Sequence, residues 1–164
     1  MNINIIAAIT KNNVIGKDGT QPWDIPEDWE YFQKVTFGHF VILGRVTNNT
    51  MPNAITNKWT KLIISKTLKN IEDGLIFQNI QDALEHCRNK KAENVFILGG
   101  QEIFKNTVKY ADKIYLTMID KIISGDKYFP ELDLQTWKLI TKSEKLINVN
   151  NGLVYCFSEW TRLK

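Results

Sequence analysis

The sequence predicts an α/β protein built around a mostly parallel sheet. Short β-branched apolar runs, bounded by polar residues or glycine, recur along the chain as expected of buried strands. Helical patterns lie between several of these runs, and this alternation is typical of crossover connections in a parallel sheet. An Asn/Gly cluster at residues 148–152 is a hairpin signal, so we expect the last strand to run antiparallel to its neighbour.

The individual elements follow from length and spacing. Six apolar runs are too short for buried helices and predict strands at residues 3–9, 40–43, 62–64, 75–77, 95–98 and 114–119. Apolar residues spaced by three and four predict helices at 26–36, 80–89 and 101–108. Residues 45–57 favour at most a short helix followed by irregular chain. Segments 137–147 and 153–160 flank the hairpin turn.

The start of the first helix carries the most informative side chain. Pro26 suits a first helical turn, and we expect Asp24 to cap the helix while Glu27 reaches back to it. Asp28 and Phe32 share a face that is otherwise apolar. A carboxylate there must find a partner, raise its pKa or bind a hydrogen-bond donor. The alternative is an ordinary first-turn acid, which the helix dipole favours.

Composition indicates one globular domain, residues 1–164, with a substantial core. A net charge of +3 with scattered lysines differs from the profile of a nucleic-acid binder and suits a small anionic ligand. Cys87 and Cys156 are too few for a disulfide framework and lie in no metal-ligand spacing, so we expect no metal and a reducing cytoplasm. We also expect no membrane span and no signal peptide.

Three predicted strand ends carry residues suited to ligands, which gather at the carboxyl ends of strands in open α/β sheets. Gly99 and Gly100 follow a strand and open a helix, where a pyrophosphate can approach the backbone; a tight turn alone is the alternative. Arg45 and Lys66 each follow another strand, beside hydroxyl side chains. Cations at these two strand ends favour NADP over NAD. The alternative is that Arg45 and Lys66 are solvated loop residues that bind no ligand.

A further candidate is the segment 14–20, which follows the first strand. Within it two glycines, Gly16 and Gly19, flank a polar stretch. The segment is either a mobile lid over a site or a plain surface loop.

Taken in order, these features resemble the dihydrofolate reductase family over essentially the whole chain. The matching pieces are Ile6-Ala7-Ala8, Val14-Ile15-Gly16, Pro22-Trp23 with Pro26-Glu27-Asp28, Gly44-Arg45-Val46-Thr47, Leu98-Gly99-Gly100-Gln101-Glu102-Ile103-Phe104, Leu116-Thr117 and Gly125-Asp126-Lys127-Tyr128-Phe129-Pro130. The resemblance implies an eight-stranded, mostly parallel sheet with an antiparallel C-terminal strand and about four helices. It implies NADPH-dependent reduction of 7,8-dihydrofolate to tetrahydrofolate by a cytoplasmic enzyme and antifolate target. We expect a monomer.

The resemblance also implies residue roles. Asp28 would bind the amino group and ring nitrogen of the pterin, with Trp23 and Thr117 holding water near it. The other substrate-binding residues would be Ile6, Ala8, Phe32, Ile55 and Lys58. The cofactor-binding residues would be Ala8, Ile15, Gly16, Gly19, Thr20, Gly44, Arg45, Val46, Thr47, Ser65, Lys66, Leu98, Gly99, Gly100, Gln101, Glu102 and Ile103. The peptide between Gly99 and Gly100 would be cis.

The chain also departs from the family pattern. Where the family has an arginine that grips the folate glutamate, this chain has Lys58, or Lys61 if a nearby insertion shifts the alignment. Lysine keeps the charge but loses the bidentate geometry, which predicts weaker binding of the folate tail. Asn48 and Asn49 replace an aromatic and an acidic residue, and Gln21 takes a lid position that is usually apolar.

Two other functions remain open. A pyrimidine reductase of riboflavin synthesis shares the fold and the cofactor, but it has no need of Trp23 and Asp28 together. A non-catalytic relic that binds folate or nucleotide would explain Lys58 and the Asn48-Asn49 pair. The intact acid, lid segment and Gly-Gly turn argue against a relic.

Overall fold

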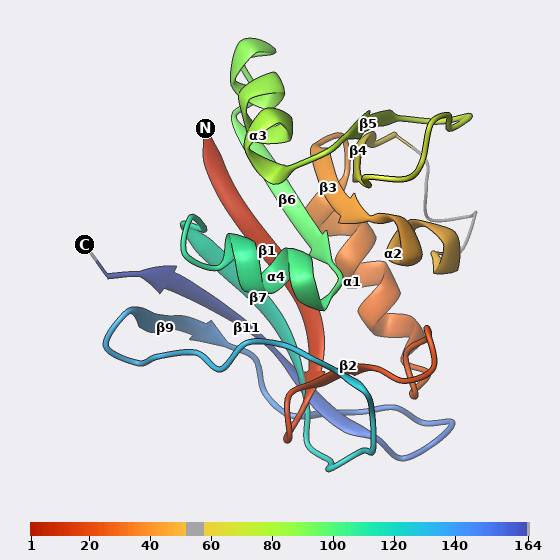
Figure 1. Ribbon diagram of the computed structural model, residues 1–164. Helices are drawn as coiled ribbons and strands as arrows, with labels where there is room; N and C mark the ends of the chain where they lie inside the picture. The colour runs from red at the N-terminus through yellow and green to blue at the C-terminus, as the bar shows by residue number, and fades with distance from the viewer. Residues whose placement is uncertain (52–57, 164) are drawn as a thin grey trace.

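The computed structural model describes residues 1–51 and 58–163, and its centre is a large twisted sheet (Figure 1). Within these ranges the sheet has nine strands, in the order β10-β11-β7-β1-β6-β3-β4-β5, with β9 pairing to β11. The strands are β1 (Asn2–Thr10), β3 (Phe40–Gly44), β4 (Thr60–Ile64), β5 (Leu75–Phe77), β6 (Asn94–Gly99), β7 (Lys113–Ile119), β9 (Trp137–Lys142), β10 (Leu146–Ile147) and β11 (Val154–Arg162).

Strand directions confirm the expected mixed sheet. The six strands from β7 to β5 pair in parallel, whereas β11 runs antiparallel to β7. Both β9 and β10 pair antiparallel with β11. The inner strands are buried along most of their length, because helices cover both faces, and this explains their continuous apolar runs.

One predicted strand, 137–147, is two strands in the structure. It breaks between β9 and β10 at Ser143, whose amide donates to the carbonyl of Phe157 while its hydroxyl accepts from the Phe157 amide. The register of β11 also shifts between Glu159 and Trp160. A bulge of this kind bends the sheet edge, and a pattern of apolar residues along one segment does not reveal it.

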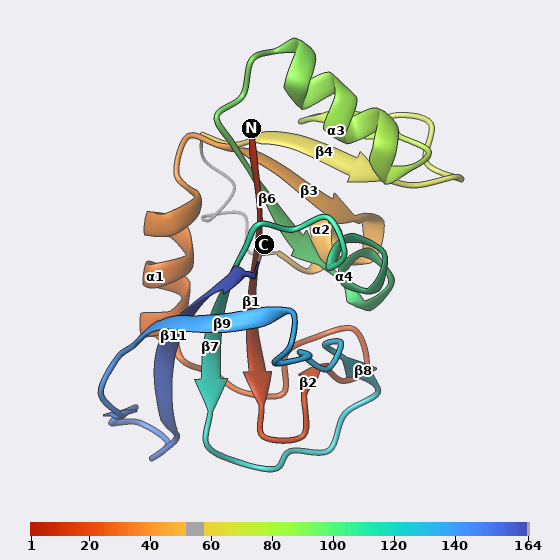
Figure 2. The same cartoon turned by 90° about the vertical axis from the view of Figure 1, so that its left-hand side faces the viewer.

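Four helices among the described residues complete the fold: α1 (Pro26–Thr36), α2 (Arg45–Thr50), α3 (Ile80–Asn89) and α4 (Gln101–Thr107). Figure 2 shows α1 on one side of the sheet and α3 and α4 on the other. Alternate side chains of each strand point to opposite faces of the sheet and pack against the helices on that face. In β6, Val95 and Ile97 join the core under α3 and α4, whereas Phe96 and Leu98 face α1. The short α2 agrees with the limited helix expected within residues 45–57.

The start of α1 differs from the expectation in one respect. Pro26 is the first helical residue, as predicted, but the capping position belongs to Ile25 and no side chain caps the helix. The carboxylate of Glu27 instead accepts a hydrogen bond from Asn148 Nδ2 at 3.0 Å, and the carbonyl of Asp24 accepts one from Asn151 Nδ2. The prediction of an Asp24 cap was wrong because the hairpin turn at 148–152 packs against this helix end and supplies other partners.

The candidate lid contributes β2 (Val14–Gly16) to a second, two-stranded sheet, in which β2 pairs with β8 (Lys127–Tyr128). The amide of Asp126 donates to the carbonyl of Gly16, and the Asp126 carboxylate accepts from the amide of Asp18, both at 3.1 Å. Segment 14–20 is therefore tied to residues 125–128 in this conformation. Whether it opens and closes over a ligand stays a prediction.

Three further observations concern the cysteines, the helices and possible metal ligands. Cys87 and Cys156 are buried free thiols. None of the helices in the described ranges is long and apolar enough to cross a membrane. The same residues contain no cluster of three or more histidine, cysteine or acidic side chains that could hold a metal.

Candidate active site

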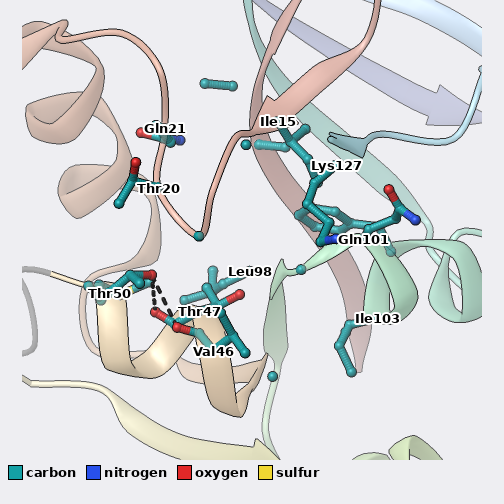
Figure 3. Close-up of a pocket in the computed structure, with 18 of the residues that line it drawn as sticks. Ile15, Thr20, Gln21, Val46, Thr47, Thr50, Leu98, Gln101, Ile103 and Lys127 are labelled. Atoms are coloured by element: carbon teal, nitrogen blue, oxygen red, sulfur yellow. Dashed lines mark hydrogen bonds between the residues drawn. The ribbon is translucent and has the colours of Figure 1, made fainter. Parts of the chain in front are cut away.

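A cleft of about 670 Å³ opens between α1, the lid segment and the ends of the central strands (Figure 3). Its walls come from β1, from the residues that follow β3, β4 and β6, and from β8. The carboxyl ends of β3, β4 and β6 meet at this edge because these strands are parallel. The cleft therefore lies where open α/β sheets bind ligands.

Asp28 provides a buried carboxylate in this cleft. It lies in the first turn of α1 and is only 8% exposed, so it is not an ordinary solvated first-turn acid. Burial raises the pKa of Asp28 from 3.8 to about 6, while a hydrogen bond donated by the Thr117 hydroxyl lowers it in part. Thr117 is itself buried, on β7 beside Ala8 of β1. A carboxyl group tuned in this way exchanges protons near neutral pH.

Trp23 adds a hydrogen-bond donor to the same cleft. Its indole Nε1 is buried and has no acceptor among the described residues. Buried donors are almost always satisfied, so a group of this kind marks a place for a ligand or a water molecule. Asp28 and Trp23 thus present one acceptor and one donor to whatever binds there.

The walls around these polar groups are apolar and aromatic. Ile6 and Leu98 extend from the sheet, and Phe32 extends from α1. The Phe32 ring is held edge-to-face by Trp29 at 5.8 Å and by Trp59 at 5.5 Å between ring centroids. An apolar wall with one acid suits a flat heterocycle that carries hydrogen-bond donors.

The Gly99–Gly100 peptide is cis, as the resemblance implied. A Cβ on Gly99 would lie 2.7 Å from the Phe104 ring, and one on Gly100 would lie 3.3 Å from Thr47 Oγ1. Gly99 has no room for a side chain, and a side chain on Gly100 would require a small shift of Thr47. The backbone therefore forms a shallow cradle that a phosphate-bearing ligand can approach.

Arg45, Thr47 and Ser65 line the cleft beside this cradle. They supply a guanidinium group and hydroxyl groups, the donors that phosphate groups prefer. Gln101 lies at the same end, where its Oε1 accepts from the amide of Tyr128 at 2.7 Å. This donor set, together with the glycine cradle, fits a phosphorylated dinucleotide.

The structure brings most of the predicted site residues together. Those that line the cleft are Ile6, Ala8, Ile15, Gly16, Gly19, Thr20, Trp23, Asp28, Phe32, Gly44, Arg45, Val46, Thr47, Ser65, Leu98, Gly100, Gln101, Glu102 and Ile103. Thr117 lies behind Asp28 and contacts its carboxylate. Gly99 and Lys66 flank lining residues without being part of the wall. Ile55 lies outside the described residues.

Lys58 and Lys61, the two candidates for the folate tail, are not among the residues that line the cleft. The Lys58 ammonium lies 5.0 Å from the centroid of the Phe37 ring. Lys61 is nearly buried, and its ammonium pairs with Asp73 at 3.0 Å. Lys58 stays the more available of the two, and its contact with a ligand stays a prediction.

Sequence reasoning missed several lining residues. Trp29 directly follows Asp28, and a helix face one residue wider would have included it. Thr50 and Met51 come from the end of α2, where the sequence carries no ligand signal. Lys127 lies within the quoted segment 125–130, yet its position in the cleft depends on how β8 pairs with β2.

Comparisons with known proteins agree with this geometry. Residues 2–162 match the family model described as dihydrofolate reductase. The chain is 32% identical over 155 residues to dihydrofolate reductase of Bacillus subtilis, covering 94% of this chain and 91% of that protein. It is 32% identical over 164 residues to dihydrofolate reductase of Staphylococcus haemolyticus, covering 100% and 98%.

A solved structure is similar over nearly the full length. It is dihydrofolate reductase from Enterococcus faecalis complexed with NADP(H) and a compound named RAB-propyl. The TM-score is 0.88 and the sequence identity is 26%, over 99% of this chain and 97% of that one. The two proteins share their fold, and the NADP(H) in that complex is a phosphorylated dinucleotide of the kind that the cleft of this chain fits.

Proposed function

The chain belongs to the dihydrofolate reductase family, and we propose how the residues of its cleft carry out the reaction of that family. The reaction is the reduction of 7,8-dihydrofolate to tetrahydrofolate, for which NADPH supplies the hydride when bound. The proposal depends mainly on one observation: the buried carboxylate of Asp28 lies in the same cleft as the Trp23 indole donor, which has no acceptor among the described residues.

Asp28 holds the pterin and promotes its protonation. Its two oxygens accept hydrogen bonds from the amino group and the adjacent ring nitrogen, which fixes the orientation of the ring. A C=N carbon accepts hydride more easily when its nitrogen is protonated. The negative charge of the Asp28 carboxylate beside the ring makes that nitrogen easier to protonate, so Asp28 promotes the step without giving up a proton itself. The proton travels through water, since the carboxylate is already engaged with the ring.

Thr117 and Trp23 position this acid and its water. The Thr117 hydroxyl donates to Oδ1 of Asp28 and so fixes one carboxylate oxygen. The Trp23 indole donor, which meets no acceptor in the described part of the chain, binds the water that relays the proton. Ile6 and Phe32 pack on the two faces of the substrate ring, and they exclude bulk water from the reacting carbon.

Different residues bind the 2′-phosphate, the pyrophosphate and the nicotinamide of the cofactor. Arg45, Thr47, Ser65 and the neighbouring Lys66 bind the 2′-phosphate end, which explains a preference for NADPH over NADH. The Gly99–Gly100 turn admits the pyrophosphate, and Ala8 with residues 14–20 lies against the nicotinamide. The protein thereby brings two flat rings face to face.

The experiment that tests this proposal follows NADPH oxidation with dihydrofolate for the wild type, Asp28→Asn and Glu30→Gln. Asparagine cannot carry the charge or the proton, so we expect turnover to fall by on the order of a hundredfold in Asp28→Asn. Glu30 is exposed on the same helix, and its matched change leaves turnover intact. Full activity in Asp28→Asn would overturn the proposed role.

The same assay addresses the alternatives. A non-catalytic relic would bind NADPH and pterin analogues without oxidising the cofactor. A pyrimidine reductase would oxidise NADPH with an aminopyrimidine substrate and would be indifferent to Asp28→Asn. The family assignment favours the folate substrate over both.

We also propose that the enzyme acts as a monomer, because residues of one chain line the cleft on all its described sides. We propose a cytoplasmic location on the basis of chemistry rather than sequence signals. Two buried thiols that form no disulfide with each other are typical of a reducing compartment.

A further inference from the structure

Lys127 is a cation in the cleft that has no role in the reaction proposed above. Arg45 and Lys127 are the two Lys or Arg side chains among the described residues that line the cleft. Figure 3 shows the Lys127 side chain entering the cleft beside Ile15, with its nitrogen directed toward the start of α4 near Gln101. It lies across the cleft from Val46 and Thr47 of α2.

The backbone that carries Lys127 is held on both sides. Lys127 pairs with Gly16 of β2, and a Cβ on Gly16 would lie 3.6 Å from Lys127 Cβ, so the lysine stem passes close over the glycine. The next amide, of Tyr128, is bound by Gln101. Phe129 is buried, 5.1 Å from the Phe104 ring of α4. The ammonium is flexible, but its stem is anchored at the wall.

The positive charge of Lys127 has no carboxylate partner within the described part of the chain. The neighbouring Asp126 accepts its hydrogen bond from the amide of Asp18. The ion pairs found within 4.0 Å among these residues involve Lys11, Lys61 and Lys145. Glu102, the acid that lines this end of the cleft, is therefore beyond that distance from the ammonium. An anchored, unpaired cation in a cleft is available to an anionic ligand.

We propose that Lys127 binds the pyrophosphate of the cofactor. This inference rests on the proposed placement of NADPH in the cleft. The cofactor carries negative charge at two places, the 2′-phosphate and the pyrophosphate, and Arg45 serves the first of them. Lys127 approaches from the wall opposite α2, near Gln101 at the start of α4, and α4 directly follows the Gly99–Gly100 turn that would admit the second. Lysine suits this task because it acts as a mobile point charge on a phosphate.

The test measures cofactor affinity, by quenching of tryptophan fluorescence, for NADPH and for NADH. NADH has the pyrophosphate but lacks the 2′-phosphate, so it separates the two possible phosphate contacts. For Lys127→Met we expect the Kd of both cofactors to rise by about fivefold, as for one partly exposed ion pair. Lys127→Arg, which keeps the charge, stays within about twofold of the wild type.

Two further variants control the interpretation. Lys142→Met removes the same charge from the exposed surface of β9 and leaves both affinities unchanged. Arg45→Met weakens NADPH but leaves NADH nearly unchanged. The Kd of the wild type rises with ionic strength, and this dependence becomes shallower in Lys127→Met because one ion pair is lost.

Three results would overturn the proposal. An unchanged Kd for Lys127→Met excludes a contact with either phosphate. A loss confined to NADPH assigns Lys127 to the 2′-phosphate instead. If the wild type binds neither cofactor, both this inference and the proposed placement of NADPH are wrong. If the wild type binds NADPH and the Kd of Lys127→Met is the same, only this inference is wrong.

Discussion

Asp28 shows at the residue scale how a catalytic requirement conflicts with stability. The folded protein keeps this carboxyl group away from water, and burial raises its pKa from 3.8 to about 6. Ionisation at neutral pH therefore costs the folded state free energy that the unfolded chain does not lose. Thr117 recovers part of this cost through its hydrogen bond. The site thus retains an acid that a more stable protein would replace.

This conflict predicts a pH-dependent gain in stability for Asp28→Asn. Between about pH 4 and pH 6 the folded state binds more protons than the unfolded chain, so the wild type loses stability as pH rises through this window. Asparagine does not ionise, and the variant avoids the loss. We expect Asp28→Asn to be more stable than the wild type by up to about 3 kcal/mol at pH 7.

Urea unfolding of both proteins at pH 4 and pH 7 measures this difference. The gain is small at pH 4, where the folded wild type holds the proton and the unfolded chain, with its ordinary pKa of 3.8, holds it in roughly half of the molecules. A variant that is less stable than the wild type at pH 7 would contradict the assigned cost of burial.

Lys58 is a second prediction at the residue scale. If it contacts the carboxylates of the folate tail, Lys58→Ala raises the Kd of dihydrofolate by about two- to threefold, the value of an exposed ion pair. The Kd of NADPH stays the same. Lys61→Ala provides the comparison, because its ammonium already pairs with Asp73 and its loss lowers stability rather than affinity. Equilibrium titration decides the matter, and an unchanged dihydrofolate affinity in Lys58→Ala removes it from the site.

At the scale of elements, the start of α1 depends on the hairpin turn that precedes β11. Asn148 is fully buried, and its Oδ1 accepts from the amides of Asn150 and Asn151 at 3.1 Å. Its Nδ2 donates to Glu27, one residue before Asp28. One amide side chain therefore organises the turn and braces the helix end that presents the acid.

Asn148→Ala should consequently destabilise the protein by about 2–3 kcal/mol, because it removes the three hydrogen bonds that this buried side chain makes to the amides of Asn150 and Asn151 and to the Glu27 carboxylate. Asn150→Ala is the matched control, since Asn150 is exposed in the same turn. The midpoint of urea unfolding measures both changes. Equal, small losses in the two variants would show that the Asn148 bonds contribute nothing specific.

At the scale of the whole molecule, the parallel sheet explains why distant segments form one cleft. The strands β3, β4 and β6 end at the same edge, which brings Gly44, Ser65 and Gly100 to one wall. The α1 layer closes the opposite side with Asp28. Loops at such an edge are free to vary in sequence while the strands hold their positions, so one sheet supports a site assembled from many short segments.

Much of this arrangement was predictable from local patterns. The strands were recognisable because β-branched apolar runs have the length of buried strands, and α1 because Pro26 precedes a helical spacing. Gly99 and Gly100 marked a ligand-facing turn, and an acid on the apolar face of α1 marked Asp28 as unusual. Each of these signals extends over no more than about ten residues.

The tertiary structure decided the contacts that join distant parts of the chain. Thr117 reaches Asp28 across 89 positions, and Asn148 reaches Glu27 across 121, which replaced the cap expected from Asp24. Lys127 enters the cleft because β8 pairs with β2. The amino-acid order alone determines the elements and their apolar faces, since these depend on neighbours in the chain. Strand pairing and turn packing determine which polar groups meet, since those depend on neighbours in space.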